Sequence, residues 1–357
     1  AVAQQHAIQT GGYDWPPGVQ WAGTAPYLFP LQQIVMWGVG PAFGIAAVAG
    51  IGVAIVTGWR RAHHPLVLPM AWAALNFAYS GALVLKTMRY FHPIYPVLAL
   101  VVAWLFAEMW RQRDRMPHIP SPVIASTIIF GAGLTITATA LWAASFAQIY
   151  TRDHPRIEAS AWIHSNLPQG SRIATEHWDD RLPLGLPNLP HDRYEYVDIR
   201  VFDRDNPDKR QHLVKVLSSA DALVLSSDRG SGAIPRMPQR YPLTIRYYET
   251  LWNGGLGFQL AAQFESRPTL ALWTIDDSDA EEAFTVYDHP RVSVFIRDAS
   301  DVAPLVTASL EQVDERGAVH VLPRVAVTAP IALAPKDAEM VRRGASWPNV
   351  YQERPLE

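Results

Sequence analysis

The chain of 357 residues contains no cysteine, which excludes disulfide bonds and metal sites built from thiolates. It also lacks an excess of either charge, because 30 Lys and Arg stand against 33 Asp and Glu, giving a formal net charge of −3. This balance gives no reason to expect a nucleic-acid partner. The first residue is Ala1, with no methionine and no charged-then-apolar leader, so we expect a fragment or a processed product.

Charged residues are scarce before Tyr150 and common after it, whereas apolar residues crowd into the first part. A helix needs roughly 20 residues to cross a hydrocarbon core of about 30 Å. Four apolar runs approach or exceed that length, and they are 31–57, 66–85, 93–110 and 122–147. The fold class predicted from these runs is a membrane all-α region of four transmembrane helices, followed by a soluble α/β extracytoplasmic domain.

Glycine is concentrated in the first apolar run. Small residues let helix backbones approach closely in membranes, so we interpret these glycines as packing positions without an active role. They are Gly38, Gly40, Gly44, Gly50 and Gly52.

The short loops predict an orientation, because Lys and Arg accumulate on the cytoplasmic side of a membrane. Loops 59–64 and 111–115 carry five arginines, against Lys86 and Arg89 in the intervening loop. We therefore expect both arginine-bearing loops in the cytoplasm, and residues 1–30, loop 86–96 and everything after about Gln148 outside. The predicted location is a plasma membrane crossed several times, with the large C-terminal domain extracytoplasmic.

The loop KTMRYFHPIYP, residues 86–96, places two cations, aromatic rings and two prolines between apolar runs. One interpretation is structural: Lys and Arg reach toward lipid headgroups, and aromatic side chains favour the interface. The other is functional, with outward cations beside a proline-stiffened helix start binding an anionic group such as a lipid-linked phosphate. The residues alone leave both interpretations open.

Residues 88–96 of this loop, MRYFHPIYP, resemble the Arg-Tyr-x-x-Pro-x-x-Pro signature of lipid-linked-sugar glycosyltransferases of the C-type fold. That group includes dolichyl-phosphate-mannose protein mannosyltransferases and bacterial aminoarabinose transferases. Residues 27–44, 151–183 and 284–296 are similar to bacterial family-39-like members, so the resemblance covers about residues 12–298.

The resemblance implies transfer of a sugar from a polyprenyl-phosphate donor to an acceptor on the outer face of the membrane. Arg89, Lys86 and Tyr90 occupy the positions that would bind the donor phosphate. In such enzymes the catalytic Asp lies in the first outer loop, and the helices that would carry it are absent from this chain. The alternative is a noncatalytic membrane-anchored module that binds a glycan, a lipid or a protein partner.

The part after Tyr150 alternates helix and strand patterns, which predicts a Rossmann-like α/β order without a glycine-rich dinucleotide fingerprint. We predict helices at 155–166 and 207–217, and strands at 171–175, 222–226, 270–275 and 292–296. The expected regions are an outer loop at 1–30, the membrane helices at 31–147, the α/β domain at 148–298 and an extension at 299–357.

The densest polar cluster, Glu176-His177-Trp178-Asp179-Asp180, follows the first predicted strand, where ligands commonly bind in open α/β sheets. Three carboxylates and an imidazole could bind a divalent cation or hold an acceptor. A hydrogen-bonded surface loop is the structural alternative. No other cofactor is predicted.

Overall fold

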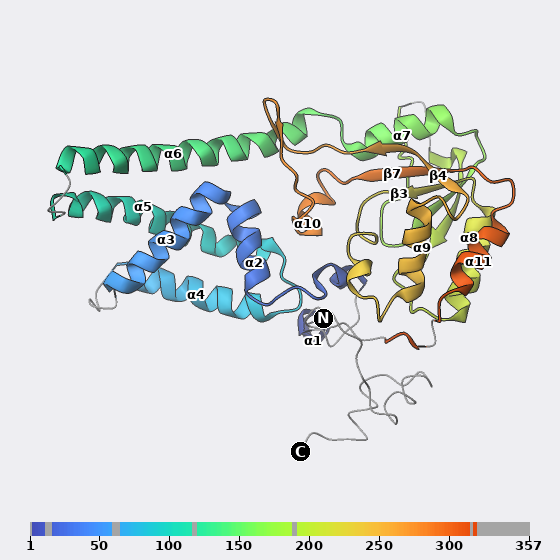
Figure 1. Ribbon diagram of the computed structural model, residues 1–357, viewed down its shortest axis with the longest axis horizontal. Coiled ribbons are helices and arrows are strands. Elements are labelled where there is room, and N and C mark those ends of the chain that lie inside the picture. Colours follow the sequence, from blue (N-terminus) through green and yellow to red (C-terminus); the bar gives the residue numbers. More distant parts are fainter. Residues whose placement is uncertain are drawn as a thin grey trace, which may run out of the picture. The chain divides into compact units, whose positions relative to one another are not determined.

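The computed structural model describes residues 2–10, 16–58, 65–115, 120–187, 191–314 and 317–319 (Figure 1). The chain divides into two compact units. One, here called the α/β unit, comprises Ala1–Thr24, Arg152–Ser266 and Thr285–Glu357. The other, the helical unit, comprises Ala25–Thr151 and Arg267–Phe284.

The α/β unit is built on a five-stranded mixed sheet with the order β2-β1-β3-β7-β4. Strand β1 lies between β2 and β3 and runs parallel to both, whereas β7 is antiparallel to β3 and β4. The carboxyl ends of β1, β2 and β3 therefore share one edge. The strands are β1 (Arg172–Glu176), β2 (Glu195–Ile199), β3 (Ala222–Leu225), β4 (Phe258–Phe264) and β7 (Val292–Arg297).

Helices cover both faces of this sheet, with α7 on one face and α8, α9 and α11 on the other (Figure 1). Neighbouring strand residues alternate between the two cores, as the two-residue period of a strand requires. Ile173 packs toward α7, and Ala174 packs toward α8 and α9. The helices are α1 (Val2–Thr10), α7 (Pro155–Asn166), α8 (Pro207–Ser219), α9 (Pro242–Trp252) and α11 (Ala303–Glu311), with a 3-10 helix at Pro16–Trp21.

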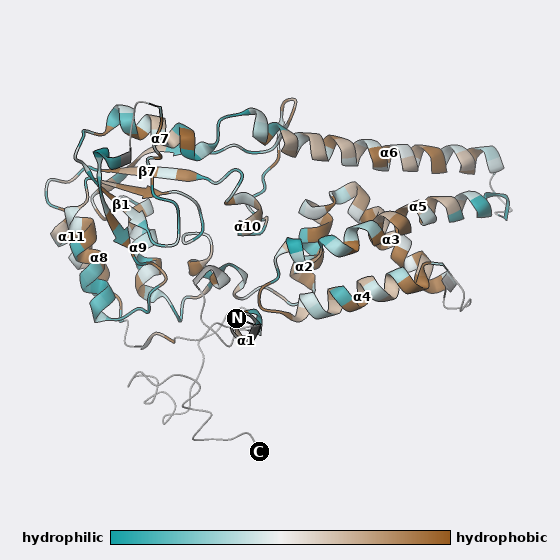
Figure 2. Ribbon diagram, turned by 180° about the vertical axis from the view of Figure 1, so that it is seen from behind, coloured by the Kyte–Doolittle hydropathy of each residue, from teal (hydrophilic) through white to brown (hydrophobic). Residues whose placement is uncertain are grey.

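The helical unit contains most of the continuous apolar sequence, and Figure 2 shows hydrophobic residues along α3 to α6. Its helices are α2 (Leu28–Gln33), a π-helical turn (Ile34–Gly38), α3 (Pro41–Gly58), α4 (Val67–Ala82), α5 (Tyr95–Gln112) and α6 (Ser121–Ala147). The returning segment 267–284 adds a hairpin of β5 (Thr269–Leu270) and β6 (Trp273–Thr274) and the start of α10 (Glu282–Thr285).

The prediction of four transmembrane helices is wrong. Within the described residues only two helical stretches, His92–Arg115 and Ser121–Asn166, are long and apolar enough to cross a membrane. The first run is interrupted because Gly40 adopts φ +83 and Pro41 begins a new helix, leaving Pro41–Thr57 as a shorter apolar helix. Helix α4 has 16 residues, which span about 24 Å.

The predicted succession of a membrane region and a separate α/β domain is wrong as well. The N-terminal residues 16–22 pack into the α/β core through Val19 and Ala22, and residues 267–284 belong to the helical unit. The chain therefore crosses between the two units more often than in the prediction from hydropathy, where one membrane region is followed by one α/β domain. Part of the expected extension also belongs to the core, since α11 buries Val306 and Leu310.

Several predicted elements are confirmed, namely the helices at 155–166 and 207–217 and the strands near 171–175, 222–226 and 292–296. The predicted strand 270–275 is instead the β5-β6 hairpin, which turns at Ala271 with φ +53. Loop 59–64, on which the orientation partly depends, lies outside the described residues.

The glycines of the first apolar run have the packing role predicted for them at four of five positions. A β-carbon at Gly38, Gly40, Gly44 or Gly50 would meet a side chain at less than van der Waals distance, whereas one at Gly52 would meet nothing within 4 Å. At Gly50 the obstacle is Val101 of α5, with its Cγ1 at 2.7 Å and its carbonyl oxygen at 3.1 Å.

Gly50→Ala and Gly52→Ala are therefore a matched pair on one helix. We expect Gly50→Ala to destabilise the helical unit by about 1 to 3 kcal/mol, because α3 and α5 must move apart. Gly52→Ala should leave stability unchanged or raise it slightly, since alanine is the better helix former. Thermal melting of the purified protein in detergent measures both, and equal melting temperatures would contradict this account of the contact.

Candidate functional site

The loop that connects α4 to α5 is held in a compact shape by two short 3-10 helices, Met88–Tyr90 and His92–Ile94. Helix α4 ends where Leu83 becomes extended, and Pro96 stands in the first turn of α5. Proline is well tolerated there because the first turn needs no backbone donor from it. The proline spacing thus fixes where α5 starts.

A buried carboxylate anchors this loop. Glu281 Oε1 accepts hydrogen bonds from Thr87 Oγ1 at 2.8 Å and from the backbone nitrogen of Met88 at 3.0 Å. Gln33 joins the same network, because its Oε1 accepts from the Glu281 backbone nitrogen and its Nε2 donates to the Asp279 carbonyl, each at 2.9 Å. The segments that contain Gln33, Thr87 and Glu281, which are far apart in the sequence, therefore meet in one hydrogen-bond network.

The three predicted phosphate-binding residues have different surroundings. Lys86 is buried, donates to the Val84 carbonyl at 3.3 Å, and has its pKa lowered by burial to about 8. Arg89 is exposed, with its guanidinium 5.8 Å from the centre of the Tyr90 ring. Tyr90 itself packs against the apolar core of the helical unit. The loop thus presents one exposed and one buried cation.

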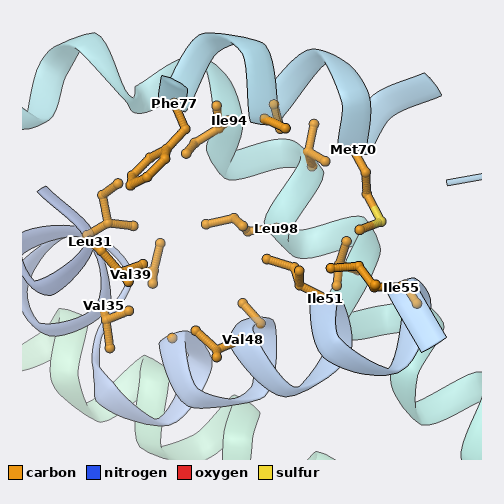
Figure 3. Close-up of a pocket in the computed structure, with 18 of the residues that line it drawn as sticks. Leu31, Val35, Val39, Val48, Ile51, Ile55, Met70, Phe77, Ile94 and Leu98 are labelled. Carbon is orange, nitrogen blue, oxygen red and sulfur yellow. The ribbon is translucent and has the colours of Figure 1, made fainter. Parts of the chain in front are cut away.

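A large apolar pocket lies among α2, the π-helical turn, α3, α4 and α5 (Figure 3). Its volume is about 820 Å³, and every side chain that lines it is apolar. Ile94, from the second 3-10 helix of the loop, and Leu98, one turn into α5, both project into it. Other lining residues include Leu31, Val35, Ile51, Met70 and Phe77.

In the α/β unit, the polar cluster predicted from sequence does lie at a strand end. Glu176 is the last residue of β1, and His177 to Asp180 follow it. Because the chain continues from β1 to β2 on one side and reaches β3 on the other, this edge is a topological switch point, where open sheets commonly bind ligands. Residues 226–230, which follow β3, lie at the same edge.

Arg156 of α7 organises this edge. Its guanidinium binds Asp179 Oδ1 at 3.2 Å, Asp180 Oδ2 at 2.9 Å and the Ser226 carbonyl at 3.3 Å. Asp179 also accepts from the Ser227 hydroxyl. These carboxylates are thus committed to protein partners, and no group of three or more His, Asp and Glu within the described ranges is placed to bind a metal. The predicted cation site is not formed by these residues.

Glu176 turns away from the other members of the cluster and into the core, where it is 5% exposed. Burial raises its pKa to about 8, and the negative charges of Asp179 and Asp228 add to the rise, while the hydroxyls of Tyr248 and Tyr247 oppose it. Glu176 is therefore neutral at pH 7. Gly230 completes this contact, because a β-carbon there would meet Tyr248 Oη and would lie 2.7 Å from Glu176 Oε2.

Trp178 is the strained residue of the edge. Its φ of +77 is unusual for a bulky side chain, a conformation that costs about 1 to 3 kcal/mol. Arg229 holds it there by donating from Nη1 to the Trp178 carbonyl at 2.6 Å. The indole ring is 43% exposed and lies 5.3 Å from the His177 ring, measured between centroids. Trp178 is thus an exposed aromatic residue of the cluster, next to the exposed His177 and close to the exposed Asp180.

Sequence reasoning identified residues 176–180 and loop 86–96, but it missed the residues that hold them. Arg156, Ser227 and Arg229 stand in other elements, and Glu281 and Gln33 lie far from loop 86–96 in the chain. A weak signal existed at 229–232, because the sequence Arg-Gly-Ser-Gly is typical of a flexible turn. Tyr247 and Tyr248 are core residues.

Comparison with protein-family models, with curated proteins and with solved structures found no match to this chain.

The buried Glu176 predicts how stability depends on pH. In the unfolded chain this carboxyl ionises near 4.5, whereas the folded protein keeps its proton to about pH 8. The folded state holds the extra proton between these values, so stability should fall as pH rises, by up to about 1.4 kcal/mol per pH unit. Glu176→Gln should remove this fall, as seen in melting temperatures from pH 5 to 8.

Glu195→Gln provides the matched control. Glu195 lies on the neighbouring strand β2 with its side chain 62% exposed, so its replacement should keep the slope of the unmodified protein. If Glu176→Gln and Glu195→Gln gave the same pH dependence, Glu176 would not hold its proton in the folded state.

Proposed function

We propose that this chain is part of an integral-membrane glycosyltransferase that moves a sugar from a polyprenyl-phosphate donor to an acceptor on the outer face of a membrane. The observation that supports this most is the junction at Ile94, where the loop bearing Lys86 and Arg89 meets the apolar pocket. A polyprenyl phosphate has the same two parts, an uncharged hydrocarbon chain and an anionic head.

The pocket suits the hydrocarbon part of such a donor. Its volume of about 820 Å³ falls in the range of ordinary ligand sites, and it has no polar side chain that a hydrocarbon would leave unsatisfied. Filling it brings the hydrocarbon chain into van der Waals contact with the apolar side chains that line the pocket. Small lining residues of α3 and α4, such as Ala47 and Ala74, leave this space open.

The loop suits the anionic part. The guanidinium of Arg89 is exposed and can bind a phosphate through two parallel hydrogen bonds, whereas Lys86 contributes a compact charge. Glu281 holds the backbone of residues 87 and 88, which connects these two cations. We assign Glu281 to positioning the loop, because it already accepts two hydrogen bonds and is buried.

The two candidate spans agree with this proposal, since α5 starts at the loop and its far end carries Arg111, Arg113 and Arg115. Arginine accumulates on the cytoplasmic side, so the proposed arrangement is multi-pass in a plasma membrane, with loop 86–96 and the α/β unit outside. The second candidate function is a noncatalytic glycan- or lipid-binding module. This second function is favoured because Glu281 already accepts hydrogen bonds from loop 86–88, which leaves its carboxyl group unsuited to act as a base.

Arg89 provides a direct test of the donor site. Arg89→Ala should weaken binding of undecaprenyl phosphate to the detergent-solubilised protein by about ten-fold or more, because charged hydrogen bonds to the phosphate are lost. Arg89→Lys should recover only part of the loss, since an ammonium restores charge without the two-pronged geometry. The same substitutions in the chromosomal gene should lower sugar transfer while protein abundance stays normal.

Arg111→Ala is the matched control for Arg89→Ala, because Arg111 is an exposed arginine at the other end of α5. It should leave binding unchanged. Uncharged undecaprenol should bind the original protein and the Arg89→Ala variant equally. If Arg89→Ala, Arg89→Lys and Arg111→Ala bound undecaprenyl phosphate with equal affinity, loop 86–96 would not be part of the donor site.

The pocket itself is tested on α4 by Ala74→Phe, which adds a ring to a lining position. We expect it to weaken binding of both undecaprenol and undecaprenyl phosphate about ten-fold, because the hydrocarbon chain loses space. Ala78→Phe places the same ring at an exposed position on α4 that does not line the pocket, and should have no effect. Equal affinities of the two variants would show that the chain binds elsewhere.

A further inference from the structure

A second exposed aromatic ring stands beside Trp178 at the edge of the α/β unit. Arg229 connects the two, because its Nη1 binds the Trp178 carbonyl and its guanidinium carbon lies 5.9 Å from the centre of the Tyr287 ring. Tyr287 is 66% exposed, and its backbone carbonyl is held by His154 Nε2 at 3.1 Å. Both residues are therefore held through their backbones while a large part of each is exposed to solvent.

The charges around these rings balance, because the guanidinium groups of Arg156, Arg229 and Arg291 stand against the carboxylates of Asp179, Asp180 and Asp228. Arg156 binds Asp179 and Asp180, and Arg291 binds Asp228 at 2.8 Å. This edge therefore differs from loop 86–96, whose two cations can attract a phosphate. Paired carboxylates and guanidinium groups still offer acceptors and donors on their outer sides, and these suit a neutral ligand that carries many hydroxyl groups.

The strain at Trp178 indicates that the ring position has a use. A bulky residue with positive φ persists only where its surroundings enforce it. Here Arg156 holds the next residue, Asp179, and Arg229 holds the carbonyl of Trp178. A core-filling role does not explain the strain, since the indole is 43% exposed. Glycine would adopt this backbone conformation without steric strain.

We propose that Trp178, Tyr287 and Arg229 form a binding site for a neutral saccharide at the carboxyl edge of the sheet. Sugar rings present flat C–H faces that stack on aromatic side chains, and their adjacent hydroxyls accept from a guanidinium or donate to a carboxylate such as that of Asp180. This saccharide site does not depend on the proposed donor site. Only the identification of the bound saccharide as the acceptor of the transferred sugar rests on the proposed function.

The test uses the whole chain in lipid nanodiscs without any polyprenyl donor. The probes are three neutral trisaccharides, built of mannose, glucose and N-acetylglucosamine, and each is observed by saturation-transfer NMR and titrated for affinity. We expect at least one to bind with a millimolar Kd. Trp178→Ala and Tyr287→Ala should each weaken it ten-fold or more, and absence of binding by all three at 10-fold higher concentration would overturn the proposal.

Trp252→Ala is the matched control, because Trp252 is a tryptophan of the same unit with nearly equal exposure, 42%, and packs against Phe295. It should keep the trisaccharide affinity within two-fold, and a loss equal to that of Trp178→Ala would overturn the assignment. Trp178→Gly separates binding from folding: it should raise the melting temperature by relieving strain and still abolish binding. Retained binding in that variant would also refute the site.

Two further arms distinguish other ligands. A trisaccharide of galacturonate that binds more tightly than the neutral ones would overturn the assignment to a neutral ligand. The fluorescence of Trp178 is the difference between the original protein and Trp178→Phe. If brominated lipids quenched this difference, the Trp178 ring would lie in the bilayer, and this would exclude a saccharide there. Arg89→Ala should leave trisaccharide binding unchanged, so the saccharide site and the donor site stand or fall separately.

Discussion

The buried guanidinium of Arg156 is the interaction on which the edge of the α/β unit depends. A buried cation needs partners on every side, and here they come from the loop after β1 and the loop after β3. Helix α7 is thereby connected to the two strands that flank the switch point. With Glu176 fixed in the core and Asp179 fixed to Arg156, Trp178 between them has little conformational freedom and adopts positive φ.

Glu281 has the corresponding position in the helical unit. Its buried carboxyl group accepts from two donors of loop 86–88, and its backbone nitrogen donates to Gln33. In both units a buried ionisable side chain from a distant segment shapes a loop, and the loop then presents a different side chain to solvent. The exposed group is Arg89 in one unit and Trp178 in the other.

The two loops differ in how their charges are compensated, and this difference decides the chemistry proposed for each. Loop 86–96 joins two cations to an apolar pocket, which favours an anion with a hydrocarbon tail. The sheet edge pairs Arg156 and Arg291 with carboxylates, which leaves aromatic faces and hydrogen-bonding groups without excess charge. Electrostatic pairing, more than residue type, therefore separates these surfaces.

The sequence alone determined the local features. Apolar periodicity and proline positions located α7, α8, β1, β3 and β7, and the polar stretch 176–180 was correctly placed at a strand end. These depend on neighbouring residues, so they can be read from short windows. Hydropathy overestimated the number of spans for two reasons. It averages over the break at Gly40–Pro41, where a positive φ separates two helices, and the second apolar run forms a helix of only 16 residues. Only the tertiary structure decided that Glu176 is buried and neutral, that Asp179 binds Arg156 instead of a metal, and that Glu281 supports the loop of Lys86 and Arg89. Each of these depends on a partner tens to hundreds of residues away, and burial and charge pairing with such a partner leave no trace in the local sequence pattern.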